Sequence, residues 1–283
     1  MITTIASPTK QVNIGEGPTV IIGERINPSN NRRMAEAMRS GDFSALADEA
    51  REQVEAGADI IDVNVGLFGI DELQLLCQAI RTIGVEAPLC LDTSNPAALE
   101  AALAICPGKP LVNSVNGEGQ SLREILPLVK QYKAAVIALT IDEDGIPRKA
   151  EDRVRIAKRI LQAAEREGIA PEDIVVDCLA TAVSHEGDAA TLALESIRLV
   201  KQDLGLNTVL GISNVSFGLP DRRALNAAFA VQAIAAGLDA AILDPTLPDV
   251  MRAVRSADLL AGRDPSARRY LAHFRGLKKR GLL

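Results

Sequence analysis

The chain has 283 residues, of which 47% are hydrophobic, and its formal net charge is -6. This length and apolar content suffice for one large domain or two small ones. The acidic balance, the 2% aromatic content and the lack of Trp argue against a nucleic-acid-binding protein, which would need a basic surface or stacking side chains. We therefore expect no nucleic-acid partner.

Residues 1–17 have neither the charged start nor the apolar core of a signal peptide, and no apolar run reaches the length of a membrane span. The sequence thus predicts a cytoplasmic protein with no membrane association. Its four cysteines show no CxxC spacing and it has two histidines, so we expect no metal site and buried, reduced cysteines. Without a GxSxG nucleophile elbow, a hydrolase is disfavoured.

Strand-like apolar runs alternate along the chain with Ala- and Leu-rich segments of helical spacing. Several helical segments end in Gly shortly before the next strand, as at Gly57, Gly168 and Gly237. Near-continuous apolar strands that alternate with helices predict a parallel sheet covered by helices. The predicted strands are 19–27, 59–66, 88–94, 110–117, 134–142, 173–180, 207–215 and 239–246.

Eight such units in about 250 residues predict a closed (β/α)8 TIM barrel. An open doubly wound sheet is the main competitor, but its GxGxxG fingerprint and the P-loop pattern are both missing. No linker interrupts the chain, so we expect a single domain over 1–283. Residues 1–18 would be a lead-in that covers the bottom of the barrel, and 262–283 a basic helical tail that is either solvated or docks an acidic partner.

Polar side chains gather where the predicted strands end, which in a TIM barrel is the position of the active site. Helix capping is the alternative role for such residues. At Asp92 a better cap follows, Ser94 or Asn95 before Pro96, and Asp177 lies far from the next helix, which begins near Asp188. The set comprises Arg25, Asn27, Asp62, Asn64, Asp92, Asn113, Asn116, Asp177, Asn214, Ser216 and Asp244.

Carboxylates and amides without a metal suit a flat polar heterocycle that presents an amino group and ring N–H donors on one edge, as a pterin does. The blocks IIGERIN, ADIIDVNVG, LDTSN, LVNSVNG, VVDCLA and GISNVSFGLPDR fall in order at the strand ends over about residues 19–260. They resemble the pterin-binding domain of methyltetrahydrofolate:corrinoid protein methyltransferases and the folate domain of cobalamin-dependent methionine synthase.

The resemblance implies a homodimeric enzyme that moves a methyl group between N5 of 5-methyltetrahydrofolate and the cobalt of a corrinoid, Co(I) or methyl-Co(III), carried by a partner protein. Anaerobic one-carbon metabolism and O-demethylation use such reactions. Cys178 replaces a proline that some family members have after the sixth-strand aspartate, which favours the branch related to methionine synthase and O-demethylases.

The same resemblance assigns residues to roles. Asn214 would be catalytic, because its carbonyl can accept the N–H bond that strengthens as N5 gains a proton. The pterin would be bound by Asp92, Asn113, Asp177, Asp62, Asn64, Arg222, Asn27 and Ser216. The source of the N5 proton stays open.

Two alternatives are retained. Dihydropteroate synthase shares the barrel and a pterin cavity, but it needs cationic groups for a pyrophosphate, and no Lys follows SNVSFG here. The other alternative is a non-catalytic folate-binding module of a larger methionine synthase-type system.

Overall fold

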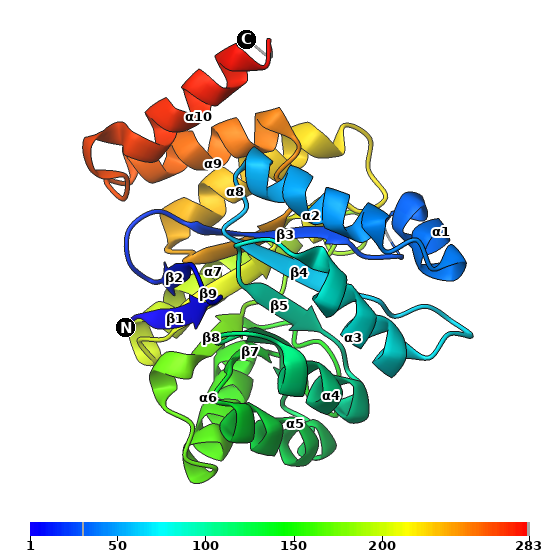
Figure 1. Ribbon diagram of the computed structural model, residues 1–283. Coiled ribbons are helices and arrows are strands. Elements are labelled where there is room, and N and C mark those ends of the chain that lie inside the picture. Colours follow the sequence, from blue (N-terminus) through cyan, green and yellow to red (C-terminus); the bar gives the residue numbers. More distant parts are fainter. Residues whose placement is uncertain (30, 282–283) are drawn as a thin grey trace.

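The computed structural model describes residues 1–29 and 31–281. Its centre is a closed barrel of parallel strands in the order β10-β3-β4-β5-β6-β7-β8-β9 (Figure 1). Each strand pairs with the next along the chain, and β10 pairs with β3 to close the barrel. The predicted TIM barrel is confirmed. The strands are β3 (Val20–Ile26), β4 (Ile60–Asn64), β5 (Leu89–Asp92), β6 (Leu111–Asn116), β7 (Ala135–Leu139), β8 (Ile174–Asp177), β9 (Asn207–Gly211) and β10 (Ala240–Leu243).

Helices surround the barrel and connect its strands (Figure 1). None of those described is long and apolar enough to cross a membrane. They are α1 (Arg32–Ser40), α2 (Ser44–Ala56), α3 (Glu72–Ile83), α4 (Pro96–Ile105), α5 (Gly119–Tyr132), α6 (Ala150–Arg166), α7 (Ala189–Asp203), α8 (Arg222–Ala236), α9 (Pro248–Leu260) and α10 (Arg268–Lys279), with short 3-10 helices η1 (Pro171–Asp173), η2 (Ile212–Ser216) and η3 (Pro265–Ala267).

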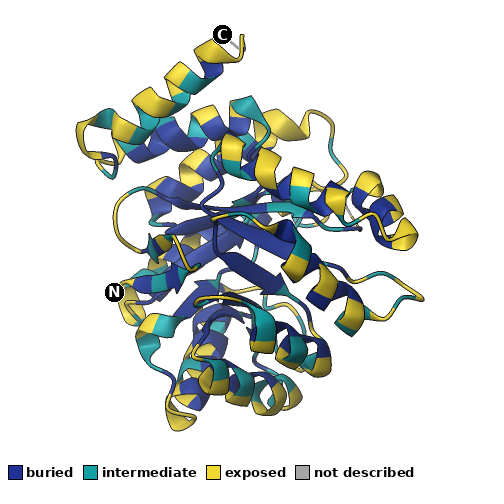
Figure 2. Cartoon of the chain, viewed as in Figure 1, coloured by how far each residue is buried: buried dark blue, intermediate teal, exposed yellow. Residues whose placement is uncertain are grey.

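Two apolar cores result from strand alternation. One fills the space between the strands and the helices, and the other fills the interior of the barrel, where Ile22, Leu111 and Val175 meet. In Figure 2 the strands are almost wholly buried, whereas exposed residues lie on the outer faces of the helices. Polar side chains therefore enter the barrel near its ends.

The expected signals for helix ends are present at α2, α4 and α8. Asn95 accepts hydrogen bonds from the backbone N–H groups of Ala97 and Ala98, and Pro96 is the first residue of α4. Asn95, one of the two predicted caps, thus leaves Asp92 free of a capping role. Gly57 and Gly237 end α2 and α8 with φ of 113° and 114°, a left-handed conformation that glycine adopts without steric cost.

An antiparallel hairpin, β1 (Thr3–Ala6) and β2 (Gln11–Ile14), lies against the amino-terminal end of the barrel. Ile5, Val12 and Ile14 are buried and belong to the apolar cluster of the barrel interior. Asn207, at the start of β9, secures the hairpin, because its Nδ2 donates to the Ile14 carbonyl and to Thr3 Oγ1, both at 3.0 Å.

Asn207→Ala is expected to lower the free energy of unfolding by about 1–3 kcal/mol, because it leaves the buried Thr3 hydroxyl and Ile14 carbonyl without this donor. Urea denaturation measures the loss. Asn13→Ala, in the less buried network on β2, is the matched control and should change stability by less than about 0.5 kcal/mol. Equal stability of the two variants would refute the proposed anchor.

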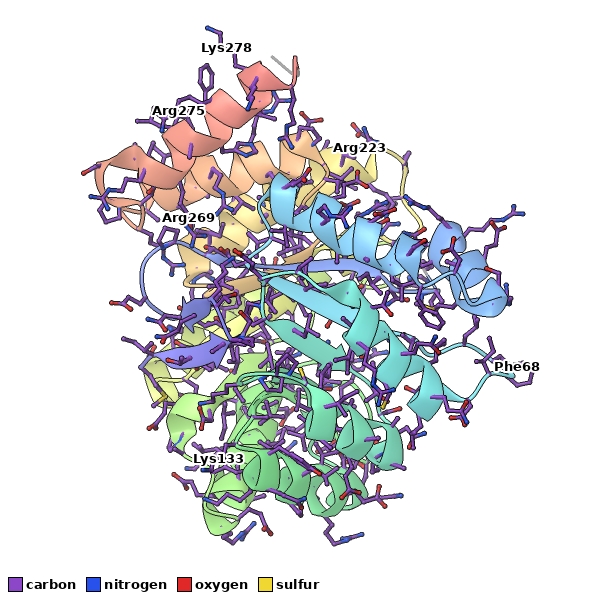
Figure 3. All side chains as sticks on the ribbon, viewed as in Figure 1. Phe68, Lys133, Arg223, Arg269, Arg275 and Lys278 are labelled. Carbon is purple, nitrogen blue, oxygen red and sulfur yellow. The ribbon has the colours of Figure 1, made fainter. Side chains whose placement is uncertain are left out.

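The expected basic tail forms α10, from which Arg275 and Lys278 project (Figure 3). Arg269 is not simply solvated, because its Nη1 lies 2.9 Å from Asp59 Oδ2 and ties α10 to the segment between α2 and β4. Residues 282–283 of the predicted tail lie outside the described residues.

The seventh predicted strand is too long. β9 ends at Gly211, and residues 212–216 form η2, so Asn214 and Ser216 lie on a 3-10 turn instead of a strand. The apolar residues Ile212 and Val215 are three apart, and both are buried. This spacing fits a 3-10 turn, in which residues i and i+3 share a face, as well as it fits an apolar run.

Candidate active site

Four of the predicted site residues form a hydrogen-bonded cluster at the carboxyl ends of β4, β5 and β6. Asn64 Nδ2 donates to Asp92 Oδ2 at 2.9 Å, and Asn113 Nδ2 donates to Asp62 Oδ1 at 3.3 Å. Strand register brings them together, since Asn64 lies opposite Asp92 and Asp92 opposite Asn113. The successive parallel pairing of β4, β5 and β6 thus brings Asp62 and Asn113, which are 51 positions apart in the chain, into contact.

The carboxyl groups of this cluster are short of donors. Burial, followed by the nearby Asp92 carboxyl, raises the pKa of Asp62, whose residue is 3% exposed. Burial also raises the pKa of Asp92. Neither carboxyl forms an ion pair within the described ranges, and each has acceptor positions beyond the amide that it binds. A ligand that brings N–H donors would offset this desolvation.

Asp177 ends β8 on a separate part of the rim. Its Oδ1 accepts the backbone N–H of Leu179 at 2.8 Å, and burial raises the pKa of the carboxyl to about 6. The other carboxylate oxygen is available to a ligand. Asp177 thus fits the predicted role of a pterin-binding carboxylate.

Asn214 lies on a cavity of about 460 Å³ that also contacts β3, β10 and α8. Its side chain is exposed and packs over Gly211, where an added Cβ would lie 2.8 Å from Asn214 Nδ2. The missing side chain at Gly211 is therefore what leaves room for the Asn214 amide.

Arg222 lines the same cavity and supports η2. Its Nε donates to Ser216 Oγ at 3.0 Å and its Nη2 to the Ser213 carbonyl at 2.8 Å, while the guanidinium lies 6.0 Å from the Phe217 ring centroid. Ser216 is fully buried. Ser216 thus holds Arg222, and its predicted contact with the pterin stays a prediction.

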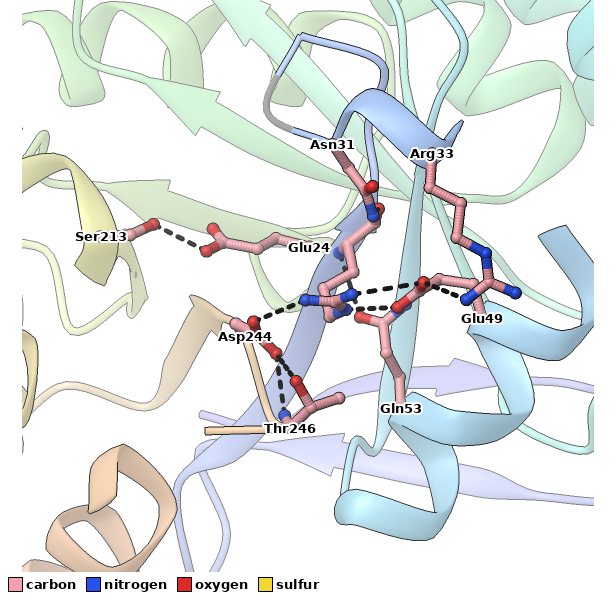
Figure 4. Close-up of polar contacts among 9 residues, drawn as sticks. Glu24, Asn31, Arg33, Glu49, Gln53, Ser213, Asp244 and Thr246 are labelled. Atoms are coloured by element: carbon pink, nitrogen blue, oxygen red, sulfur yellow. Dashed lines mark hydrogen bonds and ion pairs between the residues drawn. The ribbon is translucent and has the colours of Figure 1, made fainter. Parts of the chain in front are cut away.

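Glu24 is the site residue that the sequence analysis missed. It lines the same cavity as Asn214, and Ser213 Oγ donates to its Oε1 at 2.7 Å (Figure 4). Burial raises the pKa of the Glu24 carboxyl. The signal was present, because Val20, Ile22 and Glu24 alternate along β3 and the first two lie in the barrel interior.

Arg25, one of the polar residues predicted at the strand ends, is held by two carboxylates. Arg25 pairs with Glu49 on α2, and its Nη1 lies 2.9 Å from Asp244 Oδ2. Ile21 belongs to the core between strands and helices, so the alternation along β3 places Arg25 on the same outward face. Arg25 and Asp244 therefore fasten strand ends to α2.

Asn27 also has a local role. Its Oδ1 accepts the backbone N–H of Ser29 at 2.9 Å, which is a turn contact. Asn116 likewise accepts the N–H of Glu118 at 2.9 Å. Asn116 nevertheless lines a second cavity, of about 260 Å³, together with Asp92 and Asn113. The end of the barrel at which the strands have their carboxyl termini, its mouth, thus has two cavities, one beside Asp92 and one beside Asn214.

The part of the chain that the structure describes contains no group of three or more His, Cys, Asp or Glu side chains arranged to hold a metal ion.

A family model for pterin binding enzymes matches residues 23–244, which runs from β3 to the end of β10 and includes every element of the mouth described above. The chain belongs to the pterin-binding enzyme family. Membership agrees with a mouth built from carboxyl and amide groups, and it confirms the resemblance predicted from the strand-end motifs.

Curated relatives of known name are similar to most of this pterin-binding enzyme. A methylcorrinoid:tetrahydrofolate methyltransferase of Eubacterium limosum is 34% identical, over 90% of this chain and 96% of the relative. Methionine synthases of Mycobacterium leprae and Mycobacterium tuberculosis are 33% and 34% identical over 85% and 81% of this chain, which spans about a fifth of their length, 21% and 20%.

Solved structures confirm the fold of this pterin-binding enzyme. Dihydropteroate synthase of Yersinia pestis superposes with a TM-score of 0.68 at 15% identity, over 92% of this chain and 99% of that structure. The enzyme of Stenotrophomonas maltophilia gives 0.68 at 16% identity, over 92% and 98%. At this identity the likeness concerns the barrel alone.

Proposed function

We propose that this pterin-binding enzyme is a methyltransferase that moves a methyl group between N5 of 5-methyltetrahydrofolate and the cobalt of a corrinoid held by a partner protein. The relative named methylcorrinoid:tetrahydrofolate methyltransferase, which matches nearly end to end, supports this activity. The observation that carries the proposal is that the carboxyl groups of Asp62 and Asp92 form no ion pair with any described residue and have acceptor positions beyond the amide that each binds.

The edge of the pterin supplies what those carboxyl groups lack. Its amino group and ring N–H can donate side by side to a carboxylate, and amides can read the remaining donor and acceptor positions. Asp92, Asn113 and Asp177 would contact the ring. Asp62 and Asn64 form the floor, because their bonds to Asn113 and Asp92 orient the groups that reach the ligand.

At N5 the chain must stabilise positive charge, because a tertiary amine is a poor leaving group until N5 is protonated. The bonding pair of the N5–methyl bond then stays with N5 while the corrinoid accepts the methyl group. Asn214 can accept a hydrogen bond from protonated N5, a dipole placed where charge develops. Arg222 holds η2, and thereby Asn214, in position.

Glu24 lies in the same cavity and could hold the proton that reaches N5, because burial raises the pKa of its carboxyl. Glu24→Gln keeps the shape of the side chain but removes the titrating proton. We expect kcat for methyl transfer to fall about a hundredfold, with folate affinity nearly unchanged. Stopped-flow spectroscopy measures the rate, and a variant as fast as the wild type would exclude Glu24 from proton transfer.

The remaining expectations belong to the same proposal. We propose a single domain in the cytoplasm, with a role in anaerobic one-carbon metabolism or O-demethylation.

We also propose a homodimer, since Leu225 and Val231 are exposed on α8. A corrinoid protein would have to reach the cavity beside Asn214, which exposed Phe217 lines; Phe68 is fully exposed on the loop after β4 (Figure 3). Sedimentation velocity tests the homodimer.

The decisive test is a spectral assay with 5-methyltetrahydrofolate and free cob(I)alamin that follows formation of methylcobalamin. Transfer supports the proposal. Folate binding without transfer, also after addition of a corrinoid protein, would favour a non-catalytic module, and absence of folate binding would overturn the proposal. Formation of dihydropteroate from a pterin pyrophosphate and 4-aminobenzoate would instead favour the synthase alternative.

A further inference from the structure

Arg153 is a fully buried guanidinium on α6. It forms no ion pair among the residues described, and arginine keeps its charge in proteins. A buried charge without a counter-ion is costly, so a side chain of this kind calls for a specific role.

The partners of Arg153 lie directly behind the proposed pterin site. Its Nη1 donates to the Cys178 carbonyl at 2.7 Å and to the Leu179 carbonyl at 2.8 Å, and its Nε donates to the Pro147 carbonyl at 3.2 Å. One guanidinium thus joins the loop before α6 to the two residues that follow Asp177.

Those two residues form a strained turn. Leu179 has φ of 58°, a left-handed conformation that a branched side chain rarely adopts. In this conformation its N–H points back and donates to Asp177 Oδ1 at 2.8 Å. The orientation of the Asp177 carboxyl therefore depends on this turn. Arg153 holds the turn by hydrogen bonds to the carbonyl groups of Cys178 and Leu179.

We propose that Arg153 is a positioning residue for folate binding, which clamps the Cys178–Leu179 turn so that the Asp177 carboxylate is aimed at the pterin. The inference rests on the proposed function and adds a residue that contacts no ligand. Arg153 also acts by its charge, because it opposes the effect of burial on the Asp177 pKa.

The charges around this clamp are few. Burial, the Leu179 N–H and Arg153 act on the pKa of Asp177, whereas burial lowers the pKa of Arg153 and the carboxylates of Asp177 and Glu186 oppose that effect. Burial raises the pKa of the Cys178 thiol well above neutrality, so the thiol stays uncharged. Arg153 is thus the cation that favours ionised Asp177.

The test compares Arg153→Lys, which keeps the charge but cannot span three carbonyl groups, with Arg153→Met, which removes both. Arg155→Met, an exposed arginine on the same helix that pairs with Asp152, is the matched control. Folate dissociation constants are measured from pH 5 to 8 by calorimetry, together with the midpoint of urea denaturation.

We expect Arg153→Lys to weaken folate binding about tenfold. In Arg153→Met the pH below which affinity declines should also rise by about one unit, because the Asp177 carboxyl loses its cation. Arg155→Met should bind as the wild type does. Lower stability with an unchanged dissociation constant and pH profile in Arg153→Lys would mean that the role is merely structural and would overturn the inference.

A direct titration separates this inference from the proposed function. The Asp177 carboxyl can be followed by NMR with carbon-13-labelled aspartate in wild type and in the Arg153 variants, without folate. If the wild type binds no folate, the proposed function fails. If neither substitution changes the pKa of Asp177, the positioning role of Arg153 is refuted, whether or not folate binds. If Arg153→Met does not fold, the dissociation constant and titration of Arg153→Lys decide.

Discussion

Asn214→Ala is expected to lower kcat for methyl transfer by about 10³, the usual effect of removing one placed dipole that stabilises developing charge. In the proposed mechanism the Asn214 amide would bind N5 most strongly when N5 is protonated, so the loss should affect the transition state more than the bound substrate. We therefore expect kcat and kcat/KM to fall together, while the dissociation constant for 5-methyltetrahydrofolate changes less than about threefold. Stopped-flow spectroscopy with free cob(I)alamin gives the rate.

Two further variants sharpen this prediction. Gly211→Ala keeps the amide but places a Cβ 2.8 Å from Asn214 Nδ2, so it should displace Asn214 and slow transfer as well. Asn13→Ala removes an amide at the opposite end of the barrel and should leave the rate unchanged. Full turnover and normal folate binding in Asn214→Ala would exclude a catalytic role for this residue.

Asp177→Asn is expected to weaken folate binding about 10²-fold, because the amide cannot accept two N–H donors with the strength of a carboxylate. Burial raises the Asp177 pKa from its ordinary 3.8 to about 6. Since the carboxylate is the form that accepts both donors, wild-type affinity should decline as pH falls through about 6, and this decline should be absent in Asp177→Asn. Calorimetry across pH 5 to 8 measures both effects.

Stability distinguishes this loss from unfolding. A folded-state pKa above the unfolded value means that the folded protein binds the proton more tightly, so ionised Asp177 destabilises the fold as pH rises from about 4 to 6. At pH 7 Asp177→Asn should therefore be at least as stable as the wild type. Asp203→Asn, exposed on α7, is the control and should match the wild type in affinity and pH profile. Unchanged folate affinity in Asp177→Asn would remove Asp177 from the site.

Much of the barrel was predictable from the sequence because its signals are local. Alternation of apolar strands with helical segments determined the TIM barrel, and Asn95 before Pro96 determined where α4 begins. Regular parallel pairing of β4, β5 and β6 was enough to bring Asn64, Asp92 and Asn113 together as expected. These features depend on the period of each segment and on the order of neighbouring strands.

Tertiary structure alone decided the rest of the mouth. The Arg25 guanidinium pairs with Asp244, 219 residues away in sequence. The η2 turn moved Asn214 off the strand, and a guanidinium on α6 came to lie behind Asp177. Such contacts join residues far apart in the chain, and their energies depend on burial and geometry that no local pattern encodes.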